Sequence, residues 1–301
     1  ELKPYDIFHN YEYEFLKDTG VRVTVQIRQR QVLCKVWKID VFGNTPLYLL
    51  DTDLPENRDP WITGQLYGWF GEERIAQEIV LGIGGVRALK AMGIEPDIYH
   101  FNEGHAVLAG IELIRQNMAL GMDFNNALSE ARNKIVFTTH TPVLEGNESH
   151  PLSRIMYMGA NNNLTREQLY RIGGSPFNMT VAALRLSRIS NAVSELHCQT
   201  ANLMWKNVQG RSQIIGITNG IHIPTWVDGN MLLAAEGSYD LWQAHMKNKL
   251  ELINFVKNRT GTKLDPNVLT IGFARRATAY KRPDLIFKDP RVITPLLKTK
   301  I

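Results

Sequence analysis

The feature that most restricts the fold of this chain is a strand pattern that ends in a polar cluster and runs directly into a helix pattern. Residues 97–101 form a short run that contains β-branched and aromatic residues, and a helix pattern begins at Ala106. The turn between them carries Asn102, Glu103 and His105. In open α/β sheets ligands bind at the carboxyl ends of strands, so these polar side chains lie where such a fold places its cleft.

Two later stretches repeat this design. Residues 136–139 form a strand pattern that ends at His140, and residues 214–217 form another that runs into Asn219. A single His or Asn at a strand end is more often a satisfied structural group than a ligand. Three such ends in one α/β chain favour a shared cleft at one edge of a parallel sheet.

The first part of the chain predicts a β-rich region and one long helix. Residues 21–50 alternate in the manner of strands, and residues 72–92 have the periodicity of a helix. Residues 51–70 form a loop of acids and aromatics, which suits carbohydrate binding and a packed surface loop equally. Three glycines within the long helix indicate close packing against a neighbour: Gly82, Gly84 and Gly85.

Strand and helix patterns alternate along the rest of the chain, which predicts a mainly parallel, doubly wound α/β sheet. Residues 144–163 read as a long polar loop, a length that is usual for lids and binding loops. The helices expected after the first motif are 106–120, 125–132, 166–171, 180–188, 195–205 and 243–256. The strands expected there are 134–139, 189–193, 214–217 and 269–273.

The 301 residues are enough for two domains, or for one large domain and part of another. A new strand and helix pattern starts at Leu269, after a plausible boundary at Asp265, and the sequence stops at Ile301. We therefore expect a Rossmann-like domain with a β-rich start over residues 1–265. Residues 266–301 are expected to begin a second, truncated Rossmann-like domain.

The composition is that of an ordinary globular protein, with 44% hydrophobic and 21% charged residues. The net charge is +4, but no basic tract with interleaved aromatics occurs, so we expect no nucleic-acid partner. Cys34 and Cys198 match no metal or redox spacing, and two free thiols in the cytoplasm are expected. No apolar run of about 20 residues occurs, so no membrane span is expected.

A basic cluster follows the last predicted strand. Four cations occur within eight residues: Arg275, Arg276, Lys281 and Arg282. Arginine supplies planar bidentate donors and lysine a compact charge, and a loop that opens into a helix adds backbone N–H groups. The cluster therefore suits a phosphate or a phosphate ester. On composition alone, a solvated basic helix start remains the alternative.

Four motifs occur in order along the chain: His100–Ala106, Thr139–Pro142, Ile217–Ile221 and Arg275–Arg282. Together they resemble the glycogen, starch and maltodextrin phosphorylases, most closely the shorter bacterial and archaeal α-glucan phosphorylases. The resemblance extends from about Leu47 to Leu285. It implies a two-domain glycosyltransferase of the GT-B type, with two Rossmann-like domains that face each other across a cleft. It also implies retaining phosphorolysis of terminal α-1,4-linked glucose to α-glucose 1-phosphate, assisted by pyridoxal phosphate.

The resemblance also implies roles for individual residues. His140 would meet the glucosyl unit through its backbone carbonyl, and Arg276 and Lys281 would hold the substrate phosphate. Trp226 and Arg275 would line the cofactor site. The residues that would line the sugar pocket are Asn102, Glu103, His105 and Asn219. The implied partners are an α-1,4-glucan and inorganic phosphate, no metal site is expected, and a homodimer is left open.

The family's cofactor-bearing lysine and its glycine-rich N-terminal loop lie outside this sequence, so we expect the chain alone to be inactive. One alternative is a nucleotide-sugar glycosyltransferase of the glycogen or starch synthase type, which shares the two-domain fold and a similar strand-end His. Another is a non-catalytic glucan-binding module. The Asn-Gly-Ile stretch followed by Trp226, and the Tyr-Lys-Arg spacing at 280–282, favour the phosphorylase interpretation.

Overall fold

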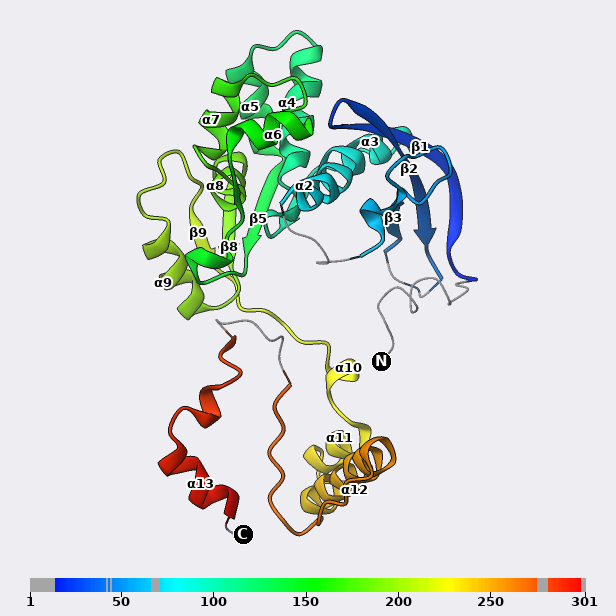
Figure 1. Ribbon diagram of the computed structural model, residues 1–301, viewed down its shortest axis with the longest axis vertical. Coiled ribbons are helices and arrows are strands. Elements are labelled where there is room, and N and C mark those ends of the chain that lie inside the picture. The colour runs from blue at the N-terminus through cyan, green and yellow to red at the C-terminus, as the bar shows by residue number, and fades with distance from the viewer. Residues whose placement is uncertain (1–13, 42, 44, 66–70, 275–280, 299–301) are drawn as a thin grey trace. The chain divides into compact units, whose positions relative to one another are not determined.

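The computed structural model describes residues 14–41, 43, 45–65, 71–274 and 281–298. The chain divides into two compact units, Glu1–Asn219 and Gly220–Ile301. Figure 1 shows both units and labels many of their helices and strands. Within the described ranges, we find no helix that combines the length and the apolar character that a membrane crossing requires.

The first unit opens with an antiparallel sheet of strand order β1-β2-β3. The strands are β1 (Lys17–Ile27), β2 (Arg30–Ile39) and β3 (Leu47–Asp51). Alternate residues of β1, namely Val23, Val25 and Ile27, are buried, as the alternating pattern predicts. Arg28 and Gln29 both have positive φ, 48° and 63°, which is the backbone of a tight hairpin turn. The β-rich start is confirmed.

The long helix pattern is confirmed and contains a π-helical segment. Its parts are α2 (Glu72–Glu78), η2 (Ile79–Gly84) and α3 (Gly85–Ala91). This composite helix packs against the antiparallel sheet on one side and against α4 (Leu108–Ala119) on another (Figure 1). A Cβ atom on Gly82 would lie 2.7 Å from the backbone nitrogen of Ala109. Glycine at position 82 therefore allows the two helices to approach each other.

A four-stranded parallel sheet forms the centre of the first unit, in the order β4-β5-β8-β9. Its strands are β4 (Tyr99–Asn102), β5 (Ile135–Thr139), β8 (Ile189–Ala192) and β9 (Ile214–Gly216). The parallel α/β sheet is confirmed, and all four carboxyl ends lie at one edge. The strands follow one another in chain order. A doubly wound sheet needs a strand on the far side of β4, and the described residues place none there.

Helices and short elements connect these strands. They are η3 (Gly104–Ala106), α5 (Phe124–Asn133), η4 (Leu144–Gly146), β6 (Ser149–His150), α6 (Leu152–Met158), α7 (Arg166–Gly173), β7 (Phe177–Asn178), α8 (Met179–Leu186) and α9 (Glu195–Met204). The prediction of a long polar loop over residues 144–163 is wrong, because β6 and α6 lie within it. Leu152, Ile155 and Met158 recur at helical spacing and are buried, but the polar residues around them hid this pattern.

The regular elements described in the second unit are helices. Its elements are α10 (Ile223–Trp226), α11 (Gly229–Ala235), α12 (Leu241–Thr260), η6 (Leu285–Phe287) and α13 (Pro290–Lys298). The predicted strand at 269–273 is wrong: this segment pairs with no described strand. Leu269, Ile271 and Phe273 are 63%, 64% and 56% exposed. A strand pattern forms a strand only when a neighbour satisfies its backbone groups. A domain boundary at Asp265 stays a prediction.

A buried carboxylate joins α3, α4 and the turn that follows α6. Glu112 Oε2 accepts hydrogen bonds from Arg87 Nη2 at 3.0 Å and Asn162 Nδ2 at 2.6 Å. Its Oε1 accepts from Arg115 Nη2 at 2.5 Å and Gln116 Nε2 at 2.9 Å. Burial alone would raise the pKa of Glu112, but these hydrogen bonds lower it to about 2. The carboxylate therefore stays charged and satisfied inside the unit.

The approach at Gly82 is testable with a matched pair of glycines on the same composite helix. We expect Gly82→Ala to destabilise the protein by about 1–3 kcal/mol, because the new Cβ meets backbone atoms that cannot rotate away. A Cβ on Gly85 would lie 4.0 Å from Leu50 Cδ1, which is an ordinary contact. Gly85→Ala should therefore be neutral or stabilise by up to about 1 kcal/mol through helix propensity. Urea unfolding measures both, and equal effects would contradict the close approach.

The Glu112 network should make stability depend on pH. Its pKa lies below the ordinary value, so its contribution is complete above pH 4.5 and is lost as pH falls towards 2. Glu112→Gln should cost on the order of 3 kcal/mol at pH 7, because one amide cannot satisfy two guanidinium groups. The loss should shrink at pH 3. Glu130→Gln, on the exposed face of α5, is the control and should stay within about 0.5 kcal/mol.

Candidate functional site

Three side chains meet at the carboxyl ends of β4 and β5, which are adjacent and parallel. His140 Nε2 lies 2.6 Å from Asn102 Oδ1. The Glu103 carboxylate accepts from the backbone N–H of His140 and, at 3.1 Å, from the hydroxyl of Thr141. Because an amide oxygen only accepts, His140 carries its proton on Nε2. The parallel pairing of the strands thus brings two motifs 38 residues apart into one hydrogen-bonded cluster.

The backbone at Glu103 turns sharply to make this possible. Glu103 has φ 65° and ψ −176°, a backbone conformation that residues other than glycine rarely adopt. Its own N–H donates to the carbonyl of Thr138 at 2.9 Å, which ties the turn to β5. The chain then leaves the sheet and enters η3, which carries His105. The turn therefore sends Glu103 towards β5 and places His105 at the start of the helical segment.

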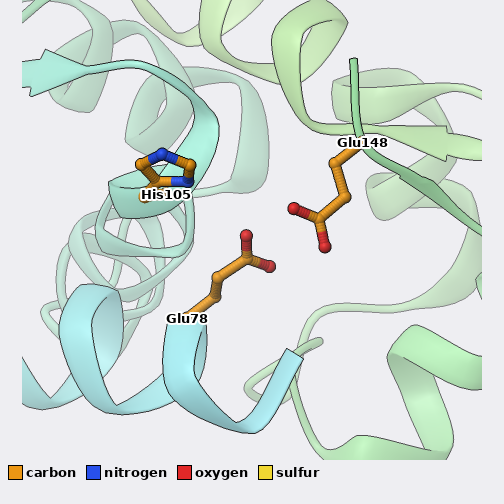
Figure 2. Close-up of side chains that lie close together, drawn as sticks. All are labelled: Glu78, His105 and Glu148. Atoms are coloured by element: carbon orange, nitrogen blue, oxygen red, sulfur yellow. The ribbon is translucent and has the colours of Figure 1, made fainter. Parts of the chain in front are cut away.

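A second cluster adjoins His105. Figure 2 shows that the side chains of Glu78, His105 and Glu148 point towards one another. They come from α2, from η3 and from the segment just before β6. The guanidinium of Arg74, one helical turn before Glu78, contacts all three. It lies 3.2 Å from Glu148 Oε2, 3.5 Å from Glu78 Oε1 and 2.5 Å from His105 Nδ1.

The two carboxyl groups of this second cluster have opposite environments. Glu78 is 2% exposed, and neither carboxyl oxygen has a hydrogen-bond partner among the described residues. Burial, and then the charge of Glu148, raise the pKa of Glu78 well above its usual range. Burial acts the same way on Glu148, but the hydrogen bond from His150 and the charge of Arg74 lower its pKa to about 2. Glu148 is thus the carboxylate that is hydrogen-bonded to Arg74, whereas burial favours the protonated form of Glu78.

One ligand atom from each of Glu78, His105 and Glu148 lies within 4.8 Å of the others, a spacing that could hold a metal ion. Arg74 is bonded to Glu148 and His105 and lies within ion-pair distance of Glu78. The cation that neutralises this cluster is therefore a guanidinium. Arg74, Glu78 and Glu148 were missed in the sequence. The available signal was Glu78, an acid next to the apolar stripe of a helix pattern.

The remaining predicted site residues lie elsewhere. Asn219 follows β9, the edge strand opposite β4, and its backbone N–H donates to the carbonyl of Val193 at 3.0 Å. Trp226 ends α10 in the second unit and is 75% exposed. Lys281 also belongs to the second unit. Arg275 and Arg276 lie outside the described residues. Within the first unit, hydrogen bonds therefore join three of the predicted residues and connect His105 to Arg74.

Two further features concern residues near these motifs. His197 is buried in the first turn of α9, and its Nδ1 accepts from the backbone N–H of Val193 at 3.3 Å. His197 therefore joins the start of α9 to the end of β8. In the loop of acids and aromatics, Thr52 and Ile62 are buried, so this part is packed. Trp69, one of the aromatics of this loop, lies outside the described residues.

The strand-end cluster has defined chemistry. Amide, carboxylate and imidazole groups offer both donors and acceptors, and Asn102 and Glu103 hold His140 in one orientation. The Thr141 hydroxyl of the cluster donates to the Glu103 carboxylate at 3.1 Å, so this carboxylate also orients a hydroxyl group. The arrangement therefore suits binding and orienting a ligand with many hydroxyl groups.

Comparison with known proteins places this geometry in a family, although no family model matches the chain. The chain is 34% identical to the maltodextrin phosphorylase of Thermococcus litoralis. The alignment is 319 residues long and covers 91% of this chain and 38% of that protein. The chain is 32% identical to the glycogen phosphorylase of Aquifex aeolicus, in an alignment that covers 88% of this chain and 46% of that protein. It is 38% identical to an uncharacterized protein of Methanocaldococcus jannaschii, in an alignment that covers 96% of this chain and 55% of that protein.

The chain thus matches these proteins along nearly all of its own length, but it spans only 38–55% of theirs. Identity of 32–38% over about 300 residues reflects common descent. The chain is a partial-length relative of the glycogen and maltodextrin phosphorylases.

Proposed function

We propose that this chain is the glucan-binding part of a cytoplasmic α-glucan phosphorylase. The whole enzyme would be a GT-B glycosyltransferase with two Rossmann-like domains. It would remove the terminal α-1,4-linked glucose of glycogen or maltodextrin with inorganic phosphate and release α-glucose 1-phosphate with retention. Because the chain spans 38–55% of its relatives, we assign glucan binding to it and catalysis to the whole enzyme.

The observation that carries this proposal is the hydrogen-bonded cluster of Asn102, Glu103 and His140 at the ends of two parallel strands. Glu103 holds the N–H of His140, so the backbone at this strand end has one orientation. In the proposed reaction the carbonyl of His140 faces the anomeric carbon. A dipole held in place before the reaction stabilises a developing positive charge better than water, which must reorient.

Sugar hydroxyls would be bound by the polar side chains around this strand end. Asn102 and Glu103 supply acceptors and donors at β4, His105 adds a ring nitrogen, and Asn219 adds an exposed amide after β9. A glucosyl unit carries several hydroxyl groups, so several weak hydrogen bonds orient it more strongly than any one of them. Homology to two named phosphorylases supports this choice of ligand.

The anionic side of the reaction is assigned to the second unit. We propose that Arg276 and Lys281 hold the attacking phosphate, and that Arg275 and Trp226 line the site of pyridoxal phosphate. The indole of Trp226 is largely exposed, so a cofactor could cover it, which fits this role. When bound, the cofactor supplies a phosphate group beside the substrate phosphate. Two such anions repel strongly at short distance, and the cations offset this repulsion.

The glucan-binding role can be tested on the 301-residue chain itself. We expect maltooligosaccharides to bind weakly, and Asn102→Ala to lower the affinity about threefold to tenfold, because it removes a sugar contact and the group that orients His140. Asn126→Ala on α5, whose amide bonds to its own helix cap at Asp123, is the control. Isothermal titration calorimetry measures both. No heat from the unsubstituted chain up to millimolar sugar would reject the binding role.

The phosphate role is tested in the full-length enzyme by steady-state phosphorolysis. Arg276→Ala and Lys281→Ala should each lose transition-state stabilisation on the order of 2–4 kcal/mol, because the phosphate is both held and oriented by these cations. Arg276→Lys should lose less than Arg276→Ala, since it keeps the charge but not the bidentate fork. Arg282→Ala is the control and should change little. A collapse with Arg282→Ala alone would place the phosphate on different cations.

A further inference from the structure

We propose that Arg74 is a positioning residue for the sugar pocket: it holds His105 as the neutral ring with its proton on Nε2, and Glu148 and Glu78 hold Arg74. The contact between Arg74 and the imidazole carries the inference. The use of His105 to bind a sugar hydroxyl rests on the proposed function, but the state of the ring does not.

Chemistry assigns the tautomer. A guanidinium has only N–H donors and cannot accept a hydrogen bond. Arg74 Nη2 lies 2.5 Å from His105 Nδ1, so Nδ1 must present a lone pair. The proton of the neutral ring is then on Nε2, which makes Nε2 a hydrogen-bond donor. A protonated ring would turn an N–H of its own towards the guanidinium and lose this bond.

The position of Arg74 is itself determined by two acids on different segments. Arg74 Nε donates to Glu148 Oε2 at 3.2 Å, and Glu78 Oε1 lies 3.5 Å away. Glu148 Oε1 is bonded to His150 Nε2 at 2.8 Å. The guanidinium therefore bridges α2, η3 and the segment before β6. That segment follows the strand end that carries His140, so the cluster also ties the two strand-end motifs to α2.

The surroundings of His105 favour the neutral ring. Burial is the main cause that lowers the pKa of His105, and the charge of Arg74 is the next. Glu103 and Glu148 act in the opposite direction, and His140 lowers it slightly. Burial favours the protonated form of Glu78, which reduces the negative charge that this group places beside the ring. A cation at Arg74 therefore offsets the acids that would otherwise draw a second proton onto the ring.

This state has a consequence for ligand choice. A neutral Nε2–H donates to an uncharged hydroxyl, whereas an imidazolium would also attract an anion. In an enzyme that handles a sugar and inorganic phosphate, a neutral His105 keeps phosphate out of the sugar pocket. Arg74 itself is paired with Glu148, which offsets its charge. Arg74 thus contributes to specificity without touching the sugar.

The ring state can be read directly in the 301-residue chain with 15N-labelled histidine. Long-range 1H–15N spectra distinguish the two neutral tautomers and the imidazolium, and His105→Gln assigns the signal. We expect the neutral form with its proton on Nε2 at pH 7, with a pKa for the ring below the ordinary histidine value. A ring that carries its proton on Nδ1, or that is charged at pH 7, would overturn the proposal without any variant.

Variants separate Arg74 from general effects. In Arg74→Met the carboxyl groups of Glu148 and Glu78 face the ring without a guanidinium, so we expect mixed tautomers and a raised pKa. Arg74→Lys keeps a cationic donor and should preserve the Nε2 proton. Arg28→Met is the matched control, because it removes the ion pair between the β1–β2 turn and Glu72 of α2, at 2.7 Å, and no contact between Arg28 and His105 is found among the described residues. An unchanged His105 signal in folded Arg74→Met would reject the role of Arg74.

Sugar binding then tests the two proposals separately. Arg74→Met should bind maltooligosaccharides about threefold to tenfold more weakly, with Arg28→Met unchanged, because one oriented donor is lost. Added phosphate should compete with sugar in Arg74→Met and not in the unsubstituted chain. If the ring signal is as expected but no sugar binds to the unsubstituted chain, the proposed function fails and the role of Arg74 stands. If sugar binds equally well to Arg74→Met, the specificity inference fails alone.

Discussion

The hydrogen bond from the backbone of His140 to Glu103 is the interaction on which the candidate site depends. It is available only because β4 and β5 are adjacent, parallel and in register, with Asn102 opposite Thr138. The positive φ of Glu103 gives the side chain its direction. A strained residue persists only where the surrounding structure holds it, and here both its backbone and its carboxylate are bonded to the end of β5.

Within the first unit, buried carboxyl groups lie beside guanidinium groups. Glu112 has two guanidinium groups and two amides, and Arg74 joins two acids and a histidine. The first network stabilises the packing of α3 and α4, where Gly82 also allows close approach. The second reaches the site through His105. Charge burial in the first unit thus serves both the fold and the pocket, through different residues.

The second unit shows that a strand pattern in the sequence does not form a strand without a neighbouring strand to pair with. Leu269, Ile271 and Phe273 alternate as a buried strand would, and yet all three are exposed in the described structure. The relatives are about twice as long as this chain or longer, with 38–55% of their length matched. The proposed phosphate binding by Arg276 and Lys281 is therefore tested in the full-length protein, whereas the proposed glucan binding is tested on the 301-residue chain.

The sequence by itself determined the parallel α/β sheet, the composite helix of residues 72–91 and the three polar strand ends, because these follow from local periodicity and turn chemistry. It also indicated the phosphorylase family through four short motifs. Only the tertiary structure decided which motif residues meet. It joined Asn102, Glu103 and His140, left Asn219 at the opposite edge strand, and introduced Arg74, Glu78 and Glu148. Helix α6 was hidden for a related reason: burial of Leu152 and Ile155 depends on contacts with distant segments. Strand pairing and ion pairs between distant segments depend on three-dimensional proximity, which local sequence patterns do not contain.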